Sequence, residues 1–185
     1  NNSIVVLNGP MCAGKSTITK LLMQQDNVFR GSYDAVKWLI SNYSADNESH
    51  RKIAKEVIFS AITTAVESGL SIVIDGGFAD FRNRYKELAQ KFNLIYVSLN
   101  IEAPIEILEK RFLERVDSAT QANSKTISVT TLEGFHSRYQ WYLNTNKDLN
   151  GTTFDSSKMS ADEIVTEIIK LTIAREGSKN NPKIT

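Results

Sequence analysis

Short runs of hydrophobic residues alternate along this chain with longer segments whose hydrophobic residues recur every three or four positions. The short runs predict strands at residues 4–7, 27–33, 71–74, 93–99 and 152–155. The longer segments predict helices at residues 15–25, 34–42, 48–68, 80–91, 104–116, 131–146 and 160–174. Because strands alternate with helices, the sequence predicts an α/β fold built around a parallel sheet.

The predicted elements fit a single domain, since 185 residues is an ordinary domain length. We place this domain at residues 1–175. Residues 117–130 are small and polar, and they predict a mobile lid that interrupts the helical pattern. Residues 176–185 predict a flexible C-terminal tail.

A glycine-rich segment follows the first predicted strand and leads into the first helix. Gly9, Gly14, Lys15 and Ser16 satisfy the pattern G-x-x-x-x-G-K-[ST]. Small residues let backbone N–H groups close around a polyphosphate, and the helix N-terminus adds partial positive charge. Lys15 can reach the β- and γ-phosphates, and the Ser16 hydroxyl can bind Mg²⁺. The predicted nucleotide cradle is Gly9, Pro10, Met11, Cys12, Ala13, Gly14, Lys15, Ser16 and Thr17.

An acidic residue ends the third predicted strand. Asp75 follows three hydrophobic residues, which is typical of a carboxylate that orients Mg²⁺ beside a P-loop. The alternative is a residue that only forms the turn at the end of a strand. Gly76 and Gly77 come next, and they would let a second substrate approach the backbone closely.

Another carboxylate, Asp34, lies at the end of the second predicted strand. At the carboxyl edge of a parallel sheet it could overlook the cleft and accept a proton from the hydroxyl of an acceptor. A cap at the N-terminus of the next helix is the alternative, and the two roles are compatible.

Several arginines are candidates for binding phosphates or an anionic substrate. Arg111 and Arg115 are four residues apart on one helical face, just before the predicted lid. We expect Arg115 to stabilise the transferring phosphoryl group. The alternative for Arg111 and Arg115 is a solvated pair that bridges Glu114 or Glu109. Arg82, Arg84 and Arg138 are further candidates that could hold an anionic substrate or the closed lid.

Composition narrows the choice of function. The formal net charge is +1, so no general nucleic-acid coat or polybasic membrane anchor is indicated. The single cysteine, Cys12, excludes an intrachain disulfide, and we expect a cytoplasmic protein. Two isolated histidines and one cysteine provide no zinc site. The aromatic residues Phe135, Tyr139, Trp141 and Tyr142 are expected to pack rather than to stack on bases.

These motifs together resemble the small P-loop kinase superfamily, and within it the polynucleotide kinase, zeta toxin and chloramphenicol phosphotransferase-like proteins. The resemblance covers residues 3–174 and implies a three-layer fold with five parallel strands in the order 2-3-1-4-5, helices on both faces and a lid. It implies that Asp34 is the base, that Arg111 lies against adenine and that Arg115 touches phosphates. Residues near Ser156 would line the base pocket. A shikimate-type triple glycine is reduced here to two glycines, so the acceptor stays open.

The sequence therefore predicts a kinase that uses ATP and Mg²⁺ to phosphorylate a hydroxyl of a small molecule or nucleotide-like acceptor. The alternatives are a polynucleotide 5′-kinase and a nucleotide-binding regulatory module. A guanine-specific switch would need Asn-Lys-x-Asp, and here Asp148 follows Asn146 one position too early. Substrate residues in this interpretation are Asp34, Gly76, Gly77, Arg82, Arg84 and Arg138, and the metal residues are Ser16 and Asp75.

Overall fold

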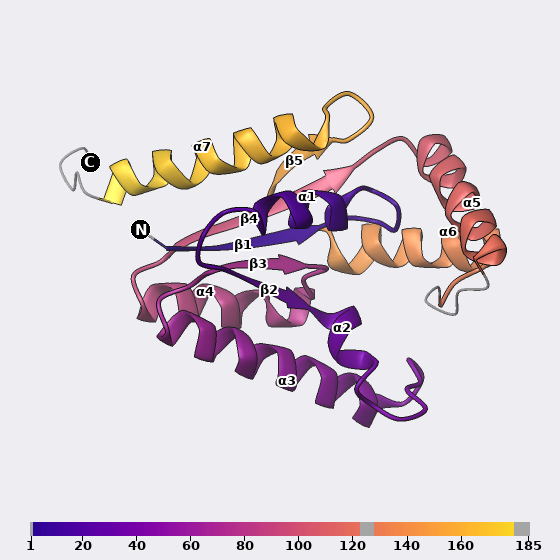
Figure 1. The fold of residues 1–185 in the computed structure, drawn as a ribbon, viewed down its shortest axis with the longest axis horizontal. Helices are drawn as coiled ribbons and strands as arrows, with labels where there is room; N and C mark the ends of the chain where they lie inside the picture. The colour runs from indigo at the N-terminus through magenta and orange to yellow at the C-terminus, as the bar shows by residue number, and fades with distance from the viewer. Residues whose placement is uncertain (1, 123–127, 180–185) are drawn as a thin grey trace.

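The centre of the protein is a five-stranded parallel sheet, as the computed structural model of residues 2–122 and 128–179 shows (Figure 1). Its strands are β1 (Ser3–Asn8), β2 (Val28–Ser32), β3 (Ser71–Asp75), β4 (Ile95–Glu102) and β5 (Thr152–Asp155). Their order is β2-β3-β1-β4-β5, which confirms the expected topology. Since β1 pairs with both β3 and β4, the glycine-rich segment begins at the middle of the sheet's carboxyl edge.

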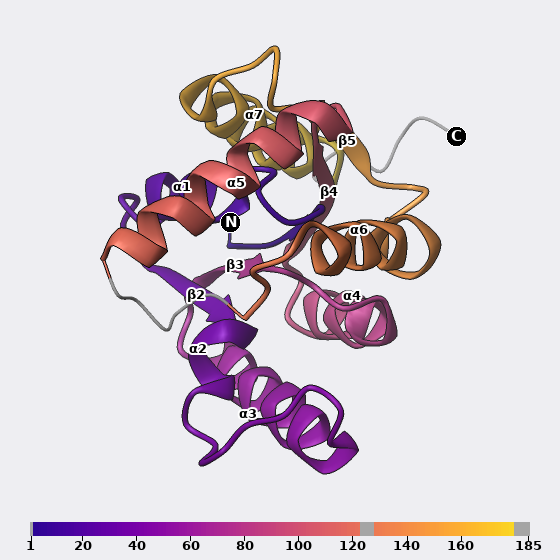
Figure 2. The same cartoon turned by 90° about the vertical axis from the view of Figure 1, so that its right-hand side faces the viewer.

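Helices cover both faces of the sheet (Figures 1 and 2). One face carries α1 (Lys15–Leu22) and α7 (Ala161–Lys179), and the other carries α3 (Glu48–Glu67) and α4 (Arg82–Lys91). The carboxyl ends of the strands point toward α2 (Tyr33–Lys37), α5 (Ile105–Gln121) and α6 (Leu132–Trp141) (Figure 1). No described helix is both long and apolar enough to cross a membrane.

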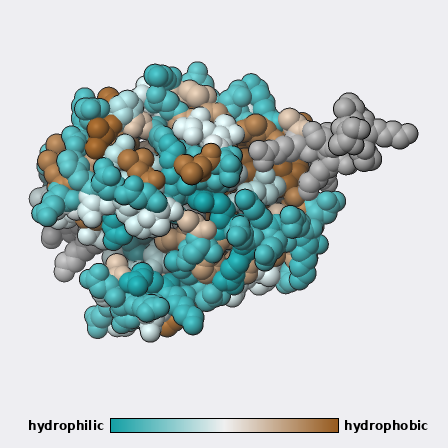
Figure 3. All heavy atoms as spheres, turned by 180° about the vertical axis from the view of Figure 1, so that it is seen from behind, coloured by the Kyte–Doolittle hydropathy of each residue, from teal (hydrophilic) through white to brown (hydrophobic). Residues whose placement is uncertain are grey.

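Alternating residues of β1 fill two separate hydrophobic clusters. Val5 and Leu7 pack with Ile18 of α1 on one face. Ile4 and Val6 pack with α3 and α4 on the other face. All four strand residues are at most 5% exposed, and burying a side chain of this size contributes about 1.5–3 kcal/mol. The outer surface is different: Figure 3 shows a mainly hydrophilic face with small separate hydrophobic patches.

Several helices differ from the bounds that the sequence predicts, and α1 already ends at Leu22 rather than at residue 25. α2 ends at Lys37 because i→i+3 bonds at Leu39 and Ile40 replace helical ones. α5 continues to Gln121, and the Ser118 and Thr120 hydroxyls donate to carbonyls one turn back. The first part of the expected lid is therefore helical, while residues 123–127 lie outside the described residues. The last turn of the expected helix 131–146 is a π-helical turn, Tyr142–Asn146.

Near the C-terminus, α7 continues through Lys179, so its backbone includes the beginning of the segment expected to be a tail. The expectation for residues 180–185 falls outside the described residues. The buried face of α7 carries Ile164, Val165 and Ile168, which pack against the same hydrophobic cluster as α1. This packing explains why the closing helix belongs to the domain.

Candidate active site

The glycine-rich loop joins β1 to α1 in a conformation that depends on its glycines. Gly9 has φ +154°, and a Cβ atom there would lie 2.3 Å from the Ile101 carbonyl oxygen of β4. Gly14 has φ +96° and is followed at once by the first turn of α1. Cys12, between them, also has a positive φ of 65°. The chain therefore turns sharply between β1 and α1, as a phosphate cradle requires.

Lys15 folds back over this loop. Its Nζ donates hydrogen bonds to the carbonyl oxygens of Gly9 and Pro10, each at 2.8 Å. Burial lowers the pKa of Lys15, and the negative charge of Asp75 opposes that shift. The ammonium group is thus held inside the cradle, where it could reach phosphate oxygens.

Ser16 and Asp75 meet at the carboxyl edge of β3. The Ser16 hydroxyl donates to Asp75 Oδ2 at 3.0 Å, and the Asp75 side chain is 9% exposed. The described residues contain no group of three or more His, Cys, Asp or Glu side chains that could hold a metal ion by themselves. One hydroxyl and one carboxylate suit Mg²⁺, which usually takes one or two carboxylates together with substrate phosphates and water. The residues present therefore fit a nucleotide-bound Mg²⁺.

A residue that the sequence reasoning missed completes this group. Arg30 of β2 donates from Nη2 to the same Asp75 Oδ2, at 2.8 Å. Strand register places Arg30 beside Val73 and Ser32 beside Asp75. The available signal was a single charge in a strand of otherwise uncharged residues, 28–32.

The predicted arginine pair of α5 lies over the other end of the loop. Arg111 donates to the Ser156 hydroxyl and carbonyl at 3.0 and 2.8 Å, and to the Cys12 carbonyl at 3.4 Å. Arg115, one turn further on, contacts the Cys12 thiol and lies near Lys15. Burial raises the pKa of the Cys12 thiol, and Arg115 opposes the shift. Both arginines thus adjoin the cradle, and Arg111 also joins the segment around Ser156 to it.

Asp34 lies in the first turn of α2, just after the carboxyl end of β2. Its side chain is 78% exposed and pairs with Lys37 Nζ at 2.6 Å. Its charge acts on Lys15, which places the two side chains in the same region. The N-cap of α2 is Ser32, so the alternative of Asp34 as the helix cap is wrong. Although it is paired with Lys37, the carboxylate remains accessible to a hydroxyl group from outside the fold.

The two glycines after Asp75 differ in their surroundings. Gly76 has φ +82° with no atom within 4 Å of an added Cβ, whereas at Gly77 that atom would lie 2.4 Å from Val6 Cγ1. The Gly77 carbonyl accepts a hydrogen bond from Asn146 Nδ2 at 2.8 Å, and Asn146 Oδ1 accepts from the Ala79 N–H at 2.9 Å. Gly77 is therefore required by packing inside the turn.

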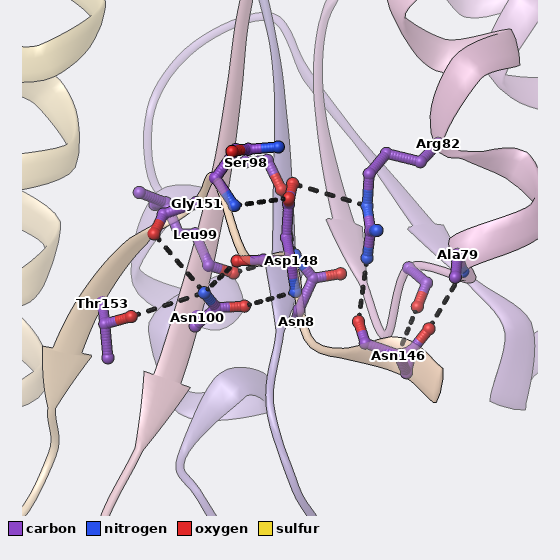
Figure 4. A network of polar contacts seen from close by, with 12 residues as sticks. Asn8, Ala79, Arg82, Ser98, Leu99, Asn100, Asn146, Asp148, Gly151 and Thr153 are labelled. Atoms are coloured by element: carbon purple, nitrogen blue, oxygen red, sulfur yellow. Dashed lines mark hydrogen bonds and ion pairs between the residues drawn. The ribbon is translucent and has the colours of Figure 1, made fainter. Parts of the chain in front are cut away.

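Asn146 belongs to a buried polar network that Figure 4 shows at close range. Arg82 Nη2 donates to the Asn146 carbonyl at 2.8 Å, and Arg82 Nε lies 3.4 Å from Asp148 Oδ2. Asn100 of β4 exchanges hydrogen bonds with the Asp148 backbone. Burial alone would raise the pKa of Asp148, but hydrogen bonds from Ser98 and the Asn150 N–H hold it below its usual value. Residues 146–148 nearly match a guanine-binding motif, but Asn146 and Asp148 are occupied by contacts within the fold.

Two of the remaining candidate arginines bind partners outside the glycine-rich loop. Arg84 makes two hydrogen bonds to Glu56 of α3, at 2.7 and 3.0 Å, and stacks over Phe59. Arg82 is held in the network just described. Arg138 is exposed on α6. We therefore exclude Arg82 and Arg84 from the site that we propose, and the role of Arg138 stays a prediction.

The aromatic residues of the α6 segment mainly pack, as expected. Phe135 and Tyr142 are fully buried, and Phe135 lies 5.1 Å from Phe112 between ring centres. Tyr142 donates to Glu102 Oε1 at 2.7 Å. Trp141 is 40% exposed and is the exception.

The sheet order and the glycine-rich loop are those of the P-loop kinase fold. Residues 5–128 match the family described as AAA domain, and the chain belongs to that family. A search of curated proteins found no match.

Solved structures share the fold at low sequence identity. A protein from Chloroflexus aurantiacus j-10-fl is 16% identical with a TM-score of 0.66, and the match covers 91% of this chain and 97% of that one. The Mycobacterium tuberculosis APS kinase CysC, in complex with AMPPNP and APS, is 14% identical with a TM-score of 0.61, covering 92% and 96%. A chain of the Pnkp1/Rnl/Hen1 complex is 16% identical with a TM-score of 0.53, covering 60% of this chain and 38% of that one.

Proposed function

We propose that this protein is an ATP- and Mg²⁺-dependent kinase that transfers the γ-phosphoryl group to a hydroxyl of a small molecule. The observation that carries the proposal is the hydrogen bond between Ser16 and Asp75 beside the cradle that Lys15 closes. A loop that served only as a tight turn would not need a lysine, a hydroxyl and a carboxylate facing one another. The similarity to an APS kinase with a nucleotide analogue and a small acceptor supports this class.

In the proposed reaction, the acceptor oxygen forms a bond to the γ-phosphorus while the bond from that phosphorus to the β,γ-bridging oxygen breaks. Asp34 accepts the proton of the acceptor hydroxyl, and ADP leaves with the bridging oxygen. Lys15 and Arg115 would neutralise the charge on the phosphates, and Ser16 and Asp75 would hold Mg²⁺. The bound metal ion would supply further charge neutralisation and help to orient the phosphates. Arg111 and the segment around Ser156 would line the side of the adenine.

The direct test is a screen with γ-labelled ATP and Mg²⁺ across nucleosides, sugars, aminoglycosides and oligonucleotide 5′ ends. We expect label on a small acceptor with the wild-type protein and none with Asp34→Asn. ATP binding without transfer to any acceptor would instead favour a regulatory module on a kinase scaffold. Preferential labelling of oligonucleotide 5′ ends would instead favour a polynucleotide 5′-kinase. The fold similarity to a chain of the Pnkp1/Rnl/Hen1 complex is the reason for including this acceptor.

A further inference from the structure

Arg30 lies on the same face of the sheet as the predicted metal residues. Side chains alternate between the two faces of a strand, so Arg30 and its register partner Val73 share a face with Asp75. Val73 packs in the cluster on the α1 side, and α1 also carries Ser16. Arg30 therefore extends from β2 toward the α1 side of the sheet and reaches Asp75 there.

A single carboxylate oxygen receives both neighbouring donors. Asp75 Oδ2 accepts from Ser16 Oγ at 3.0 Å and from Arg30 Nη2 at 2.8 Å. A carboxylate that is only 9% exposed needs a positive partner, and within the described part of the chain Arg30 is its ion-pair partner. The other nearby cation, Lys15, is bound to the loop carbonyls instead.

The guanidinium group is held loosely for an arginine–carboxylate pair. One nitrogen contacts Asp75, whereas Arg84 contacts both oxygens of Glu56. The Arg30 side chain is 35% exposed, and its Nε is buried without a hydrogen-bond partner. A group with one bond and a partly exposed side chain can move away more easily than a two-bonded one.

We propose that Arg30 is a resident counter-cation of Asp75, and that the guanidinium and Mg²⁺ compete for this carboxylate. Two positive ions repel each other strongly at contact distances in a partly buried site, so Mg²⁺ entry must weaken the pair between Arg30 and Asp75. Arg30 would then set the Mg²⁺ concentration at which nucleotide binds tightly. This inference rests on the proposed function in one respect, the assignment of Ser16 and Asp75 as metal residues.

The test compares Arg30→Met, Arg30→Lys and the matched control Arg84→Met. Arg84 suits this purpose because its side chain is 37% exposed and it also pairs with a carboxylate, outside the proposed site. Binding of a fluorescent ADP analogue is measured while Mg²⁺ is titrated, with no acceptor and no turnover. Mn²⁺ binding measured by electron paramagnetic resonance, with unlabelled ADP present at saturation, provides a second readout that follows the metal directly.

We expect Arg30→Met to lower the half-saturating Mg²⁺ concentration by about 5- to 10-fold, because one competing charge is removed. Arg30→Lys should stay near the wild-type value because it keeps the charge, and Arg84→Met should not change it. An unchanged or raised half-saturation in Arg30→Met would overturn the proposal, and a rise would mean that Arg30 orients Asp75 for the metal instead.

A double variant tests whether the effect of Arg30→Met depends on Asp75, which a general folding defect would not. In an Asp75→Asn background the carboxylate is gone, so adding Arg30→Met should produce no further shift in Mg²⁺ dependence. An equal shift in both backgrounds contradicts competition at Asp75. Wild-type protein that binds no nucleotide would defeat both the proposed function and this inference. Normal nucleotide binding without an Arg30 effect would defeat the inference alone.

Discussion

The proposed nucleotide side of the site and the proposed acceptor side are built from different kinds of contact. On the nucleotide side, Lys15 bonds to carbonyls only five and six residues away. On the acceptor side, the turn after Asp75 is held by Asn146, whose amide donates to a carbonyl 69 residues earlier in the chain. Asp34, the functional candidate on that side, is mostly exposed.

The two sides therefore differ in how far their chemistry can be recognised from other proteins. A cradle made from neighbouring residues is encoded by a short sequence motif, and this motif binds phosphate groups wherever it occurs. An acceptor pocket made from distant segments depends on how those segments pack. The nucleotide is therefore inferred from the chain itself, and the acceptor has to be found by experiment.

The largest effect is expected for Lys15→Ala, which tests the nucleotide side. It removes the ammonium that closes the cradle, so transfer should fall by about 10³-fold through lost charge stabilisation alone. Nucleotide binding should also weaken, and isothermal titration calorimetry with an ATP analogue measures it. Unchanged nucleotide affinity would show that Lys15 serves the loop's shape rather than the phosphates.

Asp34→Asn addresses the acceptor side by itself. Losing the base should reduce transfer by at least about 10²-fold, while ATP affinity should remain close to that of the wild type. Steady-state kinetics with the acceptor from the screen and calorimetry with ATP together check this. Full turnover in the variant would remove Asp34 from the mechanism.

Asn146→Ala tests whether distant contacts hold the acceptor side in shape. It leaves the Gly77 carbonyl and the Ala79 N–H without their partners, and we expect unfolding free energy to fall by about 2–4 kcal/mol. Urea denaturation measures the loss. Asn144→Ala is the matched control, since Asn144 is exposed in the same π-helical turn and should change stability by less than about 0.5 kcal/mol.

The smallest effect is expected for Arg84→Ala. Its pair with Glu56 is at the surface, and exposed pairs contribute little to stability. Transfer should be unchanged, and the melting temperature by differential scanning fluorimetry should fall only slightly. A large loss of transfer with normal folding would return Arg84 to the list of substrate residues.

The sequence predicted the fold well because its signals are local and repeated. Apolar strands and helical spacing identified the elements, and the resemblance supplied the order that the structure confirms. The errors fall at the ends of elements, and they include β4, which runs from Ile95 to Glu102 rather than from residue 93 to 99. α2 ends in turn bonds, and the segment after α6 becomes a π-helical turn whose Asn146 serves a distant turn. Spacing alone cannot report such partners.

The residues of the proposed site could be identified from the sequence only in part. The loop at residues 9–16 and Asp75 could be found from the motif and from a strand that ends in an acid. Arg30 was missed because a strand residue reveals its partner only when register is known. Arg82 and Arg84 look alike in sequence, yet one pairs with Asp148 and the other with Glu56, because helix packing decides which carboxylate each one meets.

The central place of β1 also has a consequence for synthesis of the chain. The strand before the loop has one neighbour at residues 71–75 and the other at residues 95–102. Gly9 rests against the Ile101 carbonyl, so that wall exists only after β4 has been made. Because contacts between distant residues form late, a nascent chain that stops before β4 carries the whole motif but no formed cradle.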